Sequence, residues 1–261
     1  MNSNLTKKQQ APATVLTKPA EGVYVITMNR PALTFELIDS MNKNIDEIEA
    51  STGLISLILT SSHPKIFCAG FDLNVFDEDI AVVDSYFVEV HFLYARLLKL
   101  GGPTIAAING HCVAGGVALA FSCDFRFMTS NPDLQVFMNE AEIGLPFPPA
   151  TVYHIRQKLA NHALKRLVIF GEKFSPQTAK EDKIVDNVID GDLMKHCIGF
   201  AETLKGKSTQ RLVLDDIKKV VYDSGYQAMK TEQQLNVDAF KYFVKVKKDG
   251  PAKAKRKGAK L

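Results

Sequence analysis

The stretch TIAAINGHCVAGGVALAFSCD, residues 104–124, decides the fold of this chain. Its first five residues are mostly apolar and rich in β-branched side chains, as in a buried strand. This run ends at Asn109-Gly110, and a second apolar run of helix-forming alanine and leucine begins at Gly115. A strand, a short glycine-rich turn and a buried helix are therefore predicted.

The turn before this helix is suited to a negative charge. Glycine has no Cβ atom to keep a ligand away, and the first N–H groups of a helix lack internal partners at its positive dipole end. A phosphate loop would need Gly-Lys-Ser/Thr, whereas Gly115 is followed by Gly116-Val117, and no GxGxxG spacing occurs. An oxyanion site is expected; the alternative is that both glycines only allow close packing of helix on strand.

Composition limits the class of protein. The 261 residues are 46% hydrophobic and 23% charged, as in one soluble α/β domain, and neither a secretory leader nor a membrane span is expected. The four cysteines lack metal-ligand spacing, which suits reduced thiols. Residues 249–261 carry a net charge of +4 whereas the whole chain carries +3, so the rest of the chain has a net charge of −1 and offers no basic surface for a nucleic acid.

Strand and helix patterns alternate along the chain. Residues 22–28 alternate as a strand does, and residues 35–50 have apolar side chains every three or four positions, as in an amphipathic helix. Residues 54–59, LISLIL, predict a strand covered on both faces. Further elements are expected over residues 80–100, 124–128, 134–137 and 183–189.

This order of elements predicts four parts of the chain. The parts are a poorly ordered lead over residues 1–20, an α/β core over residues 21–190, a helical region over residues 191–248 and a basic flexible tail over residues 249–261. The helical region is expected to break near Gly206 and Gly225.

A second segment, IFCAGFDLNVF (66–76), is expected to contribute backbone to the same site. It bends at Ala69-Gly70, and glycine allows a sharp turn there. The N–H group of Phe71 can then project into a cleft instead of pairing in a sheet.

A third segment, NEAEIGLPFPP (139–149), predicts an irregular loop that carries two carboxylates. Catalytic groups are often placed on loops that a rigid scaffold fixes. If the loop is buried, desolvation would raise the pKa of a glutamate toward that of a useful general base. The alternative is that Glu140 and Glu142 simply face solvent.

Three motifs together, FCAGFDL (67–73), AAINGHCVAGGVALAFSCDFRF (106–127) and NEAEIGLPFP (139–148), resemble the crotonase, or enoyl-CoA hydratase/isomerase, superfamily. The resemblance covers about residues 22–189 in order and spacing. It implies an α/β fold with a ββα spiral core. The helical end resembles the trimer-forming helices of that family, which implies a homotrimer or hexamer.

The resemblance also implies a site. The family shares an oxyanion hole of two backbone N–H groups that holds the enolate of an acyl-CoA thioester, and here the donors fall on Phe71 and Gly115. The general base falls on Glu140, with Glu142 as its rival. Arg30 or a C-terminal lysine is expected to help hold the CoA. The positions expected to contact the substrate are Ala69, Gly70, Phe71, Gly115, Gly116 and Leu145, with Phe76 and residues 145–149 lining an acyl tunnel.

One departure from the hydratases indicates the reaction. Hydratases have a first glutamate in the helix after the glycines, where this chain has Ala118. A single carboxylate suffices for a proton shuttle, as in the Δ3,Δ2-enoyl-CoA isomerases of unsaturated fatty-acid β-oxidation. No metal and no cofactor beyond the CoA of the substrate is implied. The alternatives are a hydratase or thioester hydrolase that uses His111 or Glu142, and a non-catalytic acyl-CoA-binding module.

The segment Ala259-Lys260-Leu261 resembles the Ser-Lys-Leu peroxisomal address. It implies a peroxisomal location and recognition by the import receptor. The mitochondrial matrix is the alternative, because the first residues lack acids but also lack arginine.

Overall fold

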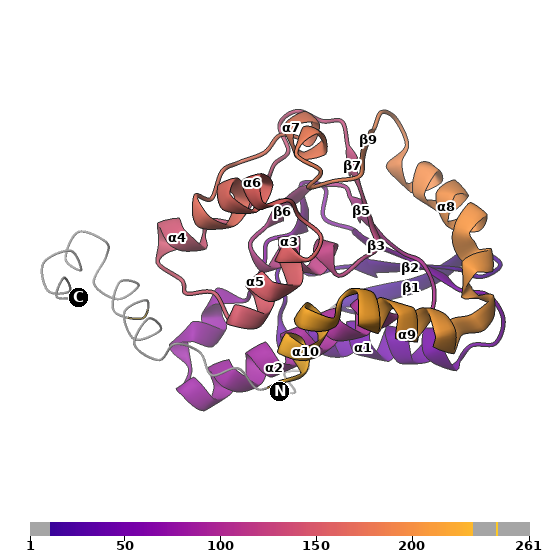
Figure 1. Cartoon of the computed structure of the whole chain (residues 1–261), viewed down its shortest axis with the longest axis horizontal. Helices are drawn as coiled ribbons and strands as arrows, with labels where there is room; N and C mark the ends of the chain where they lie inside the picture. Colours follow the sequence, from indigo (N-terminus) through magenta and orange to yellow (C-terminus); the bar gives the residue numbers. More distant parts are fainter. Residues whose placement is uncertain (1–10, 232–243, 245–261) are drawn as a thin grey trace, which may run out of the picture.

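A six-stranded sheet in the order β1-β2-β3-β5-β7-β9 forms the frame of the protein (Figure 1). The computed structural model describes residues 11–231 and residue 244. The β1–β2 pair is antiparallel, whereas the other pairs are parallel. The strands are β1 (Thr14–Ala20), β2 (Val23–Met28), β3 (Ser56–Ser61), β5 (Thr104–Ile108), β7 (Phe125–Thr129) and β9 (Asn187–Ile189).

A second, three-stranded parallel sheet carries the segments that matter for the site. It consists of β4 (Ile66–Cys68), β6 (His111–Val113) and β8 (Val136–Phe137), in the order β4-β6-β8. Cys68 pairs with Cys112, and Val113 pairs with Phe137. The turn expected before Gly115 therefore contains a strand of its own.

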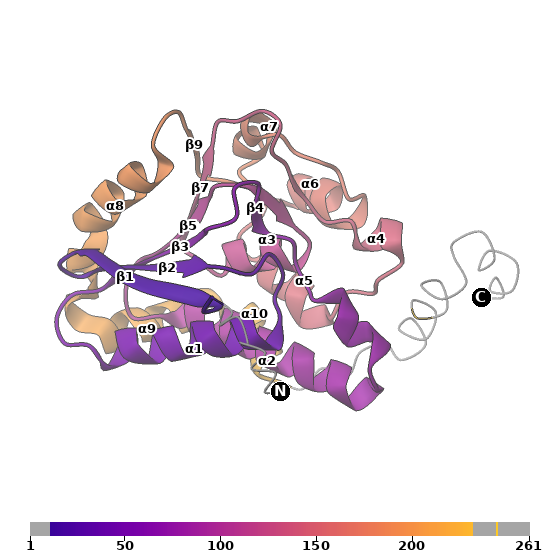
Figure 2. The same cartoon turned by 180° about the vertical axis from the view of Figure 1, so that it is seen from behind.

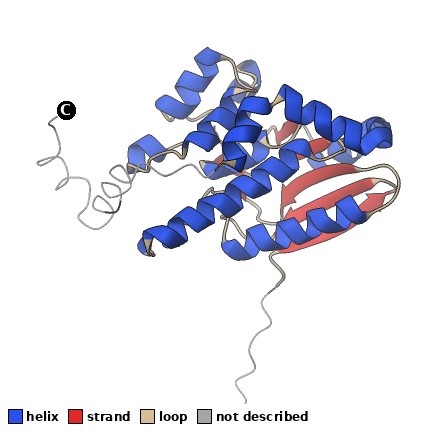
Figure 3. Ribbon diagram, turned by 60° about the horizontal axis from the view of Figure 1, so that its bottom comes forward, coloured by secondary structure: helices blue, strands red, loops and turns tan. Residues whose placement is uncertain are grey.

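Helices cover both faces of the larger sheet (Figures 1 and 2). Because successive side chains of a strand point to opposite faces, Tyr24 and Ile26 join the main core whereas Val23 and Val25 pack in a second core with α8. In Figure 3 helices make up most of the view, with the strands visible between them. The helices are α1 (Phe35–Ala50), α2 (Ile80–Lys99), α3 (Gly115–Phe121), α4 (Glu140–Ile143), α5 (Pro149–Arg156), α6 (Asn161–Leu164), α7 (Pro176–Glu181), α8 (Leu193–Leu204), α9 (Arg211–Val221) and α10 (Asp223–Lys230), joined by the short turns η1 (Leu73–Asp77), η2 (Lys165–Ile169) and η3 (Lys205–Gln210).

The amphipathic pattern of α1 is confirmed in detail. Its side chains Leu37, Met41 and Ile45 are fully buried. The Thr34 hydroxyl accepts a hydrogen bond from the N–H of Leu37 at 3.1 Å, which satisfies one of the donors left over at the start of the helix. Helix α1 therefore begins and packs as its sequence predicts.

The prediction of a poorly ordered lead through residue 20 is wrong for its last part. Residues 14–20 form β1, which pairs with β2 through a turn at Gly22, where φ is +71°. Pro19 is tolerated because β1 lies at the edge of the sheet, where a missing N–H group costs little.

One other expectation is wrong in part, and a second is met three residues from the expected position. The segment expected to be an irregular loop begins with one helical turn, α4, which ends at Gly144 in the left-handed conformation. The helix break expected near Gly225 lies at Tyr222, where α9 and α10 meet, and Gly225 itself lies inside α10. A Cβ atom on Gly225 would lie 3.0 Å from the Cα atom of His154, so this glycine allows α10 to pack on α5.

The basic tail over residues 249–261, with the segment Ala259-Lys260-Leu261, lies outside the described residues, as does most of the region over residues 232–248. Within the described parts of the chain, each helix is too short or too polar to cross a membrane.

Candidate active site

The three predicted segments meet at one edge of the small sheet. Because β4, β6 and β8 are parallel, the residues that follow them leave the sheet at the same edge. Phe71 follows β4, Gly115 follows β6 and Glu140 follows β8. The N–H of Ala114 donates to the carbonyl of Phe137 at 2.9 Å, which ties the second segment to the third.

The first two segments are in direct contact at Gly70. A Cβ atom on Gly70 would lie 2.8 Å from the Cβ of Ala114 and 2.9 Å from the backbone nitrogen of Gly115. Gly70 also has a φ of +94°, which other residues rarely adopt. Only glycine allows this approach, which places the backbone of Phe71 beside that of Gly115.

Neither the N–H group of Phe71 nor that of Gly115 has a hydrogen-bond partner among the described residues. The Gly70 carbonyl accepts from the N–H of Leu33 at 2.8 Å, so the Phe71 N–H of the same planar peptide points away from Leu33. The Gly115 N–H is the first of α3 and has no partner within the helix. Within the described residues, both N–H groups are thus left available to donate to a ligand.

Ala114 introduces strain at this point. Its φ of +53° and ψ of −125° are unusual for a residue with a Cβ atom. Such a conformation costs on the order of 1–3 kcal/mol and tends to occur at functional sites. The surrounding bonds of β6 and α3 hold Ala114 in it and thereby set the direction of the Gly115 N–H.

Glu140 is buried with both oxygens unsatisfied. Its side chain has an exposed fraction of 0%, and neither carboxylate oxygen has a hydrogen-bond partner among the described residues. Burial raises the pKa of this carboxyl from 4.5 to about 7. Glu142, two residues on, is exposed. Burial thus distinguishes the predicted base from its rival.

Tyr94 binds the glycine turn. Its hydroxyl donates to the carbonyl of Gly115 at 2.7 Å. Burial raises the pKa of this phenol, and the charge of Glu140 adds to the effect.

Three other residues that were expected to contact the substrate make bonds or close contacts within the protein. Leu145 is buried, and its N–H donates to the carbonyl of Glu140 at 2.9 Å, which closes α4. A Cβ atom on Gly116 would collide with the carbonyl of Cys68, so Gly116 serves the close packing of α3 on β4. Ala69 is exposed, and its N–H donates to the carbonyl of Pro31 at 2.6 Å.

Arg30 is already bound within the protein. Its guanidinium contacts both carboxylate oxygens of Glu36, at 3.1 and 2.9 Å, and donates to the carbonyl of Ala11 at 2.8 Å. It could reach a CoA phosphate only by giving up these bonds. The C-terminal lysines that were the other candidates lie outside the described residues.

His111 has a local role in the structure. Its Nδ1 accepts a hydrogen bond from the N–H of Gln135 at 3.1 Å, which fixes the segment before β8. Its tautomer then places the ring proton on Nε2.

Sequence reasoning missed two tyrosines of α2. Tyr86 and Tyr94 belong to the apolar stripe of this helix, where an aromatic residue ordinarily indicates core packing. Their hydroxyl groups bind the backbone of Leu33 and Gly115, which lie 53 and 21 residues away in the chain. Nothing in the local pattern reveals such partners.

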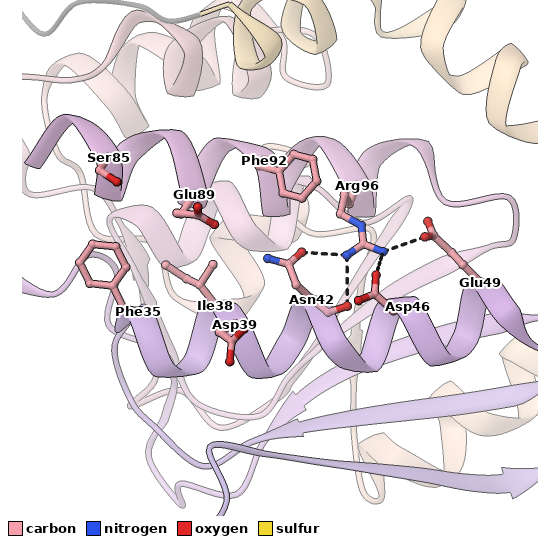
Figure 4. A pocket seen from close by; sticks show the side chains of 10 residues that line it. All are labelled: Phe35, Ile38, Asp39, Asn42, Asp46, Glu49, Ser85, Glu89, Phe92 and Arg96. Carbon is pink, nitrogen blue, oxygen red and sulfur yellow. Dashed lines mark hydrogen bonds and ion pairs between the residues drawn. The ribbon is translucent and has the colours of Figure 1, made fainter. Parts of the chain in front are cut away.

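A groove of about 710 Å³ between α1 and α2 is too acidic to hold phosphates (Figure 4). Arg96 donates to Asn42, Asp46 and Glu49, so its charge is neutralised by α1. The acids among the residues that line the groove are Asp39, Asp46, Glu49 and Glu89. The groove lies between two helices, and its acidic side chains would repel a polyphosphate.

The chain is similar to several known proteins. The family model described as "Enoyl-CoA hydratase/isomerase" matches residues 18–258. The human mitochondrial enoyl-CoA delta isomerase 1 is 30% identical over 181 residues, which cover 67% of this chain and 60% of that protein. A short-chain-enoyl-CoA hydratase of Clostridium acetobutylicum is 29% identical over 175 residues, which cover 64% of this chain and 66% of that protein. The chain thus spans less than two thirds of the length of these relatives.

The fold has close structural neighbours. The crystal structure of human mitochondrial delta3-delta2-enoyl-CoA isomerase matches with a TM-score of 0.78 at 24% identity, covering 93% of this chain and 95% of that one. At this identity the likeness shows the fold alone. The crotonase-type α/β fold expected from the three motifs is confirmed.

Proposed function

Because the chain belongs to the enoyl-CoA hydratase/isomerase family, we propose that it is a Δ3,Δ2-enoyl-CoA isomerase that converts 3-enoyl-CoA to trans-2-enoyl-CoA. The observation that carries the proposal is Glu140, a buried carboxylate with no hydrogen-bond partner among the described residues and a pKa raised to about 7. A general base with this pKa is about half ionised at neutral pH and able to accept a proton.

The reaction would proceed by one proton abstraction and one proton return. Glu140 removes a proton from C2, and the electrons of that C–H bond form a dienolate. The thioester oxygen of the dienolate accepts hydrogen bonds from the N–H groups of Phe71 and Gly115. Glu140 then returns the proton to C4, so the double bond moves from C3–C4 to C2–C3. The route needs no cofactor besides the CoA of the substrate.

Ala118 favours isomerisation over hydration. It is fully buried in α3, at the position of the first glutamate of hydratases, and its methyl group can neither orient nor deprotonate a water molecule. The residues proposed to replace that glutamate fit poorly, because His111 is bound to Gln135 and Glu142 is exposed. A single carboxylate is sufficient for a proton shuttle.

Hydration remains the second candidate function, because the relatives include a hydratase. Isomerisation and hydration are both tested by incubating the purified protein with a 3-enoyl-CoA and, separately, with a trans-2-enoyl-CoA. The expected result is appearance of the conjugated thioester from the first substrate and little addition of water to the second. Hydration faster than isomerisation would overturn the proposal. Binding of acyl-CoA without turnover would instead favour a non-catalytic module.

We also propose a homotrimer or hexamer, because α9 exposes an apolar side. Leu212 and Val220 have exposed fractions of 80% and 77%, and Val213, Ile217 and Val221 are also exposed. A monomeric protein rarely leaves a contiguous apolar surface of this kind in water.

Val220→Glu is expected to convert the oligomer to monomers, because a charge cannot be desolvated in an apolar contact. Sedimentation velocity measures the result. Val88→Glu, which changes an exposed valine of α2, is the matched control and should leave the oligomer intact. A monomeric wild-type protein would rule out the assembly.

The location stays a proposal. The segment that suggests peroxisomal import lies outside the described residues, and the human relative is named as mitochondrial, which supports the mitochondrial alternative.

A further inference from the structure

Two buried tyrosines of α2 hold the backbone of the proposed oxyanion hole, and we propose that Tyr86 and Tyr94 are positioning residues of this site. The inference rests on the proposed function, because it assigns both tyrosines to the step that stabilises the dienolate. Both side chains are fully buried. They are eight residues apart on α2, which is about two helical turns or 12 Å along the axis.

Tyr86 fixes the backbone around Phe71. Its hydroxyl accepts from the N–H of Asp72 at 2.9 Å and donates to the carbonyl of Leu33 at 2.6 Å. The N–H of Leu33 in turn donates to the carbonyl of Gly70 at 2.8 Å. The peptide before Phe71 is therefore held through the Gly70 carbonyl, and the peptide after it is held through Tyr86.

Tyr94 fixes the backbone around Gly115 in the same way. The carbonyl of Ala114, in the peptide that carries the Gly115 N–H, accepts from the N–H of Val117 at 2.9 Å. The carbonyl of Gly115, in the following peptide, accepts from the Tyr94 hydroxyl at 2.7 Å. Both peptides on either side of the second donor are thus held as well.

The two donors share one arrangement. A backbone bond holds the peptide that carries the donor N–H, and a tyrosine hydroxyl holds the next peptide. Because a peptide is planar, a bond to one of its polar atoms also fixes the direction of the other. Since both hydroxyl groups are attached to α2, this helix sets the distance between the loop that carries Phe71 and the loop that carries Gly115. Donors that are already oriented need no rearrangement when charge develops on the substrate.

A merely structural role would have different consequences. Buried tyrosine hydroxyl groups usually find a partner, and these bonds could serve stability alone. Replacement by phenylalanine would then lower the melting temperature and leave the chemical step unchanged. Positioning instead predicts a specific loss in the step that forms the enolate.

The first measurement is steady-state kinetics on 3-enoyl-CoA for Tyr86→Phe, Tyr94→Phe and the double variant. Complete loss of one oxyanion donor costs about 10²- to 10³-fold in kcat, so a loosened donor is expected to cost about tenfold and both together about a hundredfold. KM should change by less than about twofold, because the ground state depends little on these donors. Tyr24→Phe is the control, since Tyr24 is buried and its hydroxyl makes no hydrogen bond to a described residue.

The second measurement is a spectroscopic signature of the enolate. A 3-oxoacyl-CoA is the probe, because its bound enolate absorbs in the near ultraviolet and the neutral keto form absorbs much less. Wild type and Tyr24→Phe should generate the enolate band. Each α2 variant should bind the probe with a weaker band while binding a saturated acyl-CoA as wild type does.

Unchanged kcat and an unchanged enolate band in both α2 variants would overturn the inference alone. A wild-type protein that neither isomerises 3-enoyl-CoA nor forms the enolate would overturn the proposed function, and the inference with it. Should Tyr94→Phe fail to fold, Tyr86→Phe decides the question, because its bonds lie on the other loop.

Discussion

Glu140→Gln is expected to lower kcat for 3-enoyl-CoA isomerisation by about 10²- to 10⁴-fold, the range that a positioned general base contributes. Glutamine has nearly the same shape and cannot accept the proton from C2. The measurement is the rate at which the conjugated thioester appears at saturating substrate. Glu142→Gln is the matched control and should keep nearly full activity, because its side chain is exposed.

The pH dependence identifies the same group. In the wild type, kcat/KM should rise with pH through about 7, because the carboxyl must lose its proton to act as a base and burial raises its pKa to about 7. The residual activity of Glu140→Gln should not follow this profile. Retention of the wild-type profile in that variant would assign the base to another residue.

The same substitution should raise stability at alkaline pH. The Glu140 carboxyl has a pKa near 4.5 when exposed and about 7 in the folded protein, so the unfolded state ionises first. The free energy of unfolding therefore falls as pH rises from about 4.5 through 7, by up to about 3 kcal/mol. Glutamine does not titrate. Denaturant unfolding at pH 5 and pH 8 should show Glu140→Gln gaining stability over the wild type at the higher pH, which also proves that the inactive variant is folded.

Gly70→Ala is expected to lower kcat by about 10²- to 10³-fold, the cost of losing an oxyanion donor. The new Cβ atom would lie 2.9 Å from the Gly115 nitrogen and 3.0 Å from the Val113 carbonyl oxygen, both of which belong to the backbone. The two loops must then separate, and the N–H groups of Phe71 and Gly115 no longer converge on one oxygen. Steady-state kinetics and the melting temperature are measured together.

Gly191→Ala is the matched control for this prediction. Gly191 has a φ of +90°, close to the +94° of Gly70, and a Cβ atom there would meet nothing within 4 Å. Both variants carry the strain of a positive φ, but only Gly70→Ala displaces the site. Equal kcat values for the two variants would show that the contact between the loops is unimportant for the reaction.

The sequence by itself determined several of the elements, α1 and α3 among them, and named the candidate residues. The spacing of apolar side chains predicted α1, and the run from Thr104 to Asp124 predicted the strand, turn and α3. These are local signals, because periodicity and turn chemistry depend on near neighbours. The motif resemblance placed the oxyanion donors on Phe71 and Gly115 and the base on Glu140, which stay predictions until activity is measured.

Only the tertiary structure decided how these residues lie with respect to one another. Strand β1 can contain Pro19 because the strand lies at the edge of the sheet, and no local pattern in the sequence reveals that position. The burial of Glu140, the engagement of Arg30 by Glu36 and the bonds of the α2 tyrosines depend on segments that are distant in sequence. Desolvation and hydrogen bonding depend on everything that surrounds a group in space, so the raised pKa of Glu140 arises only when the chain is folded.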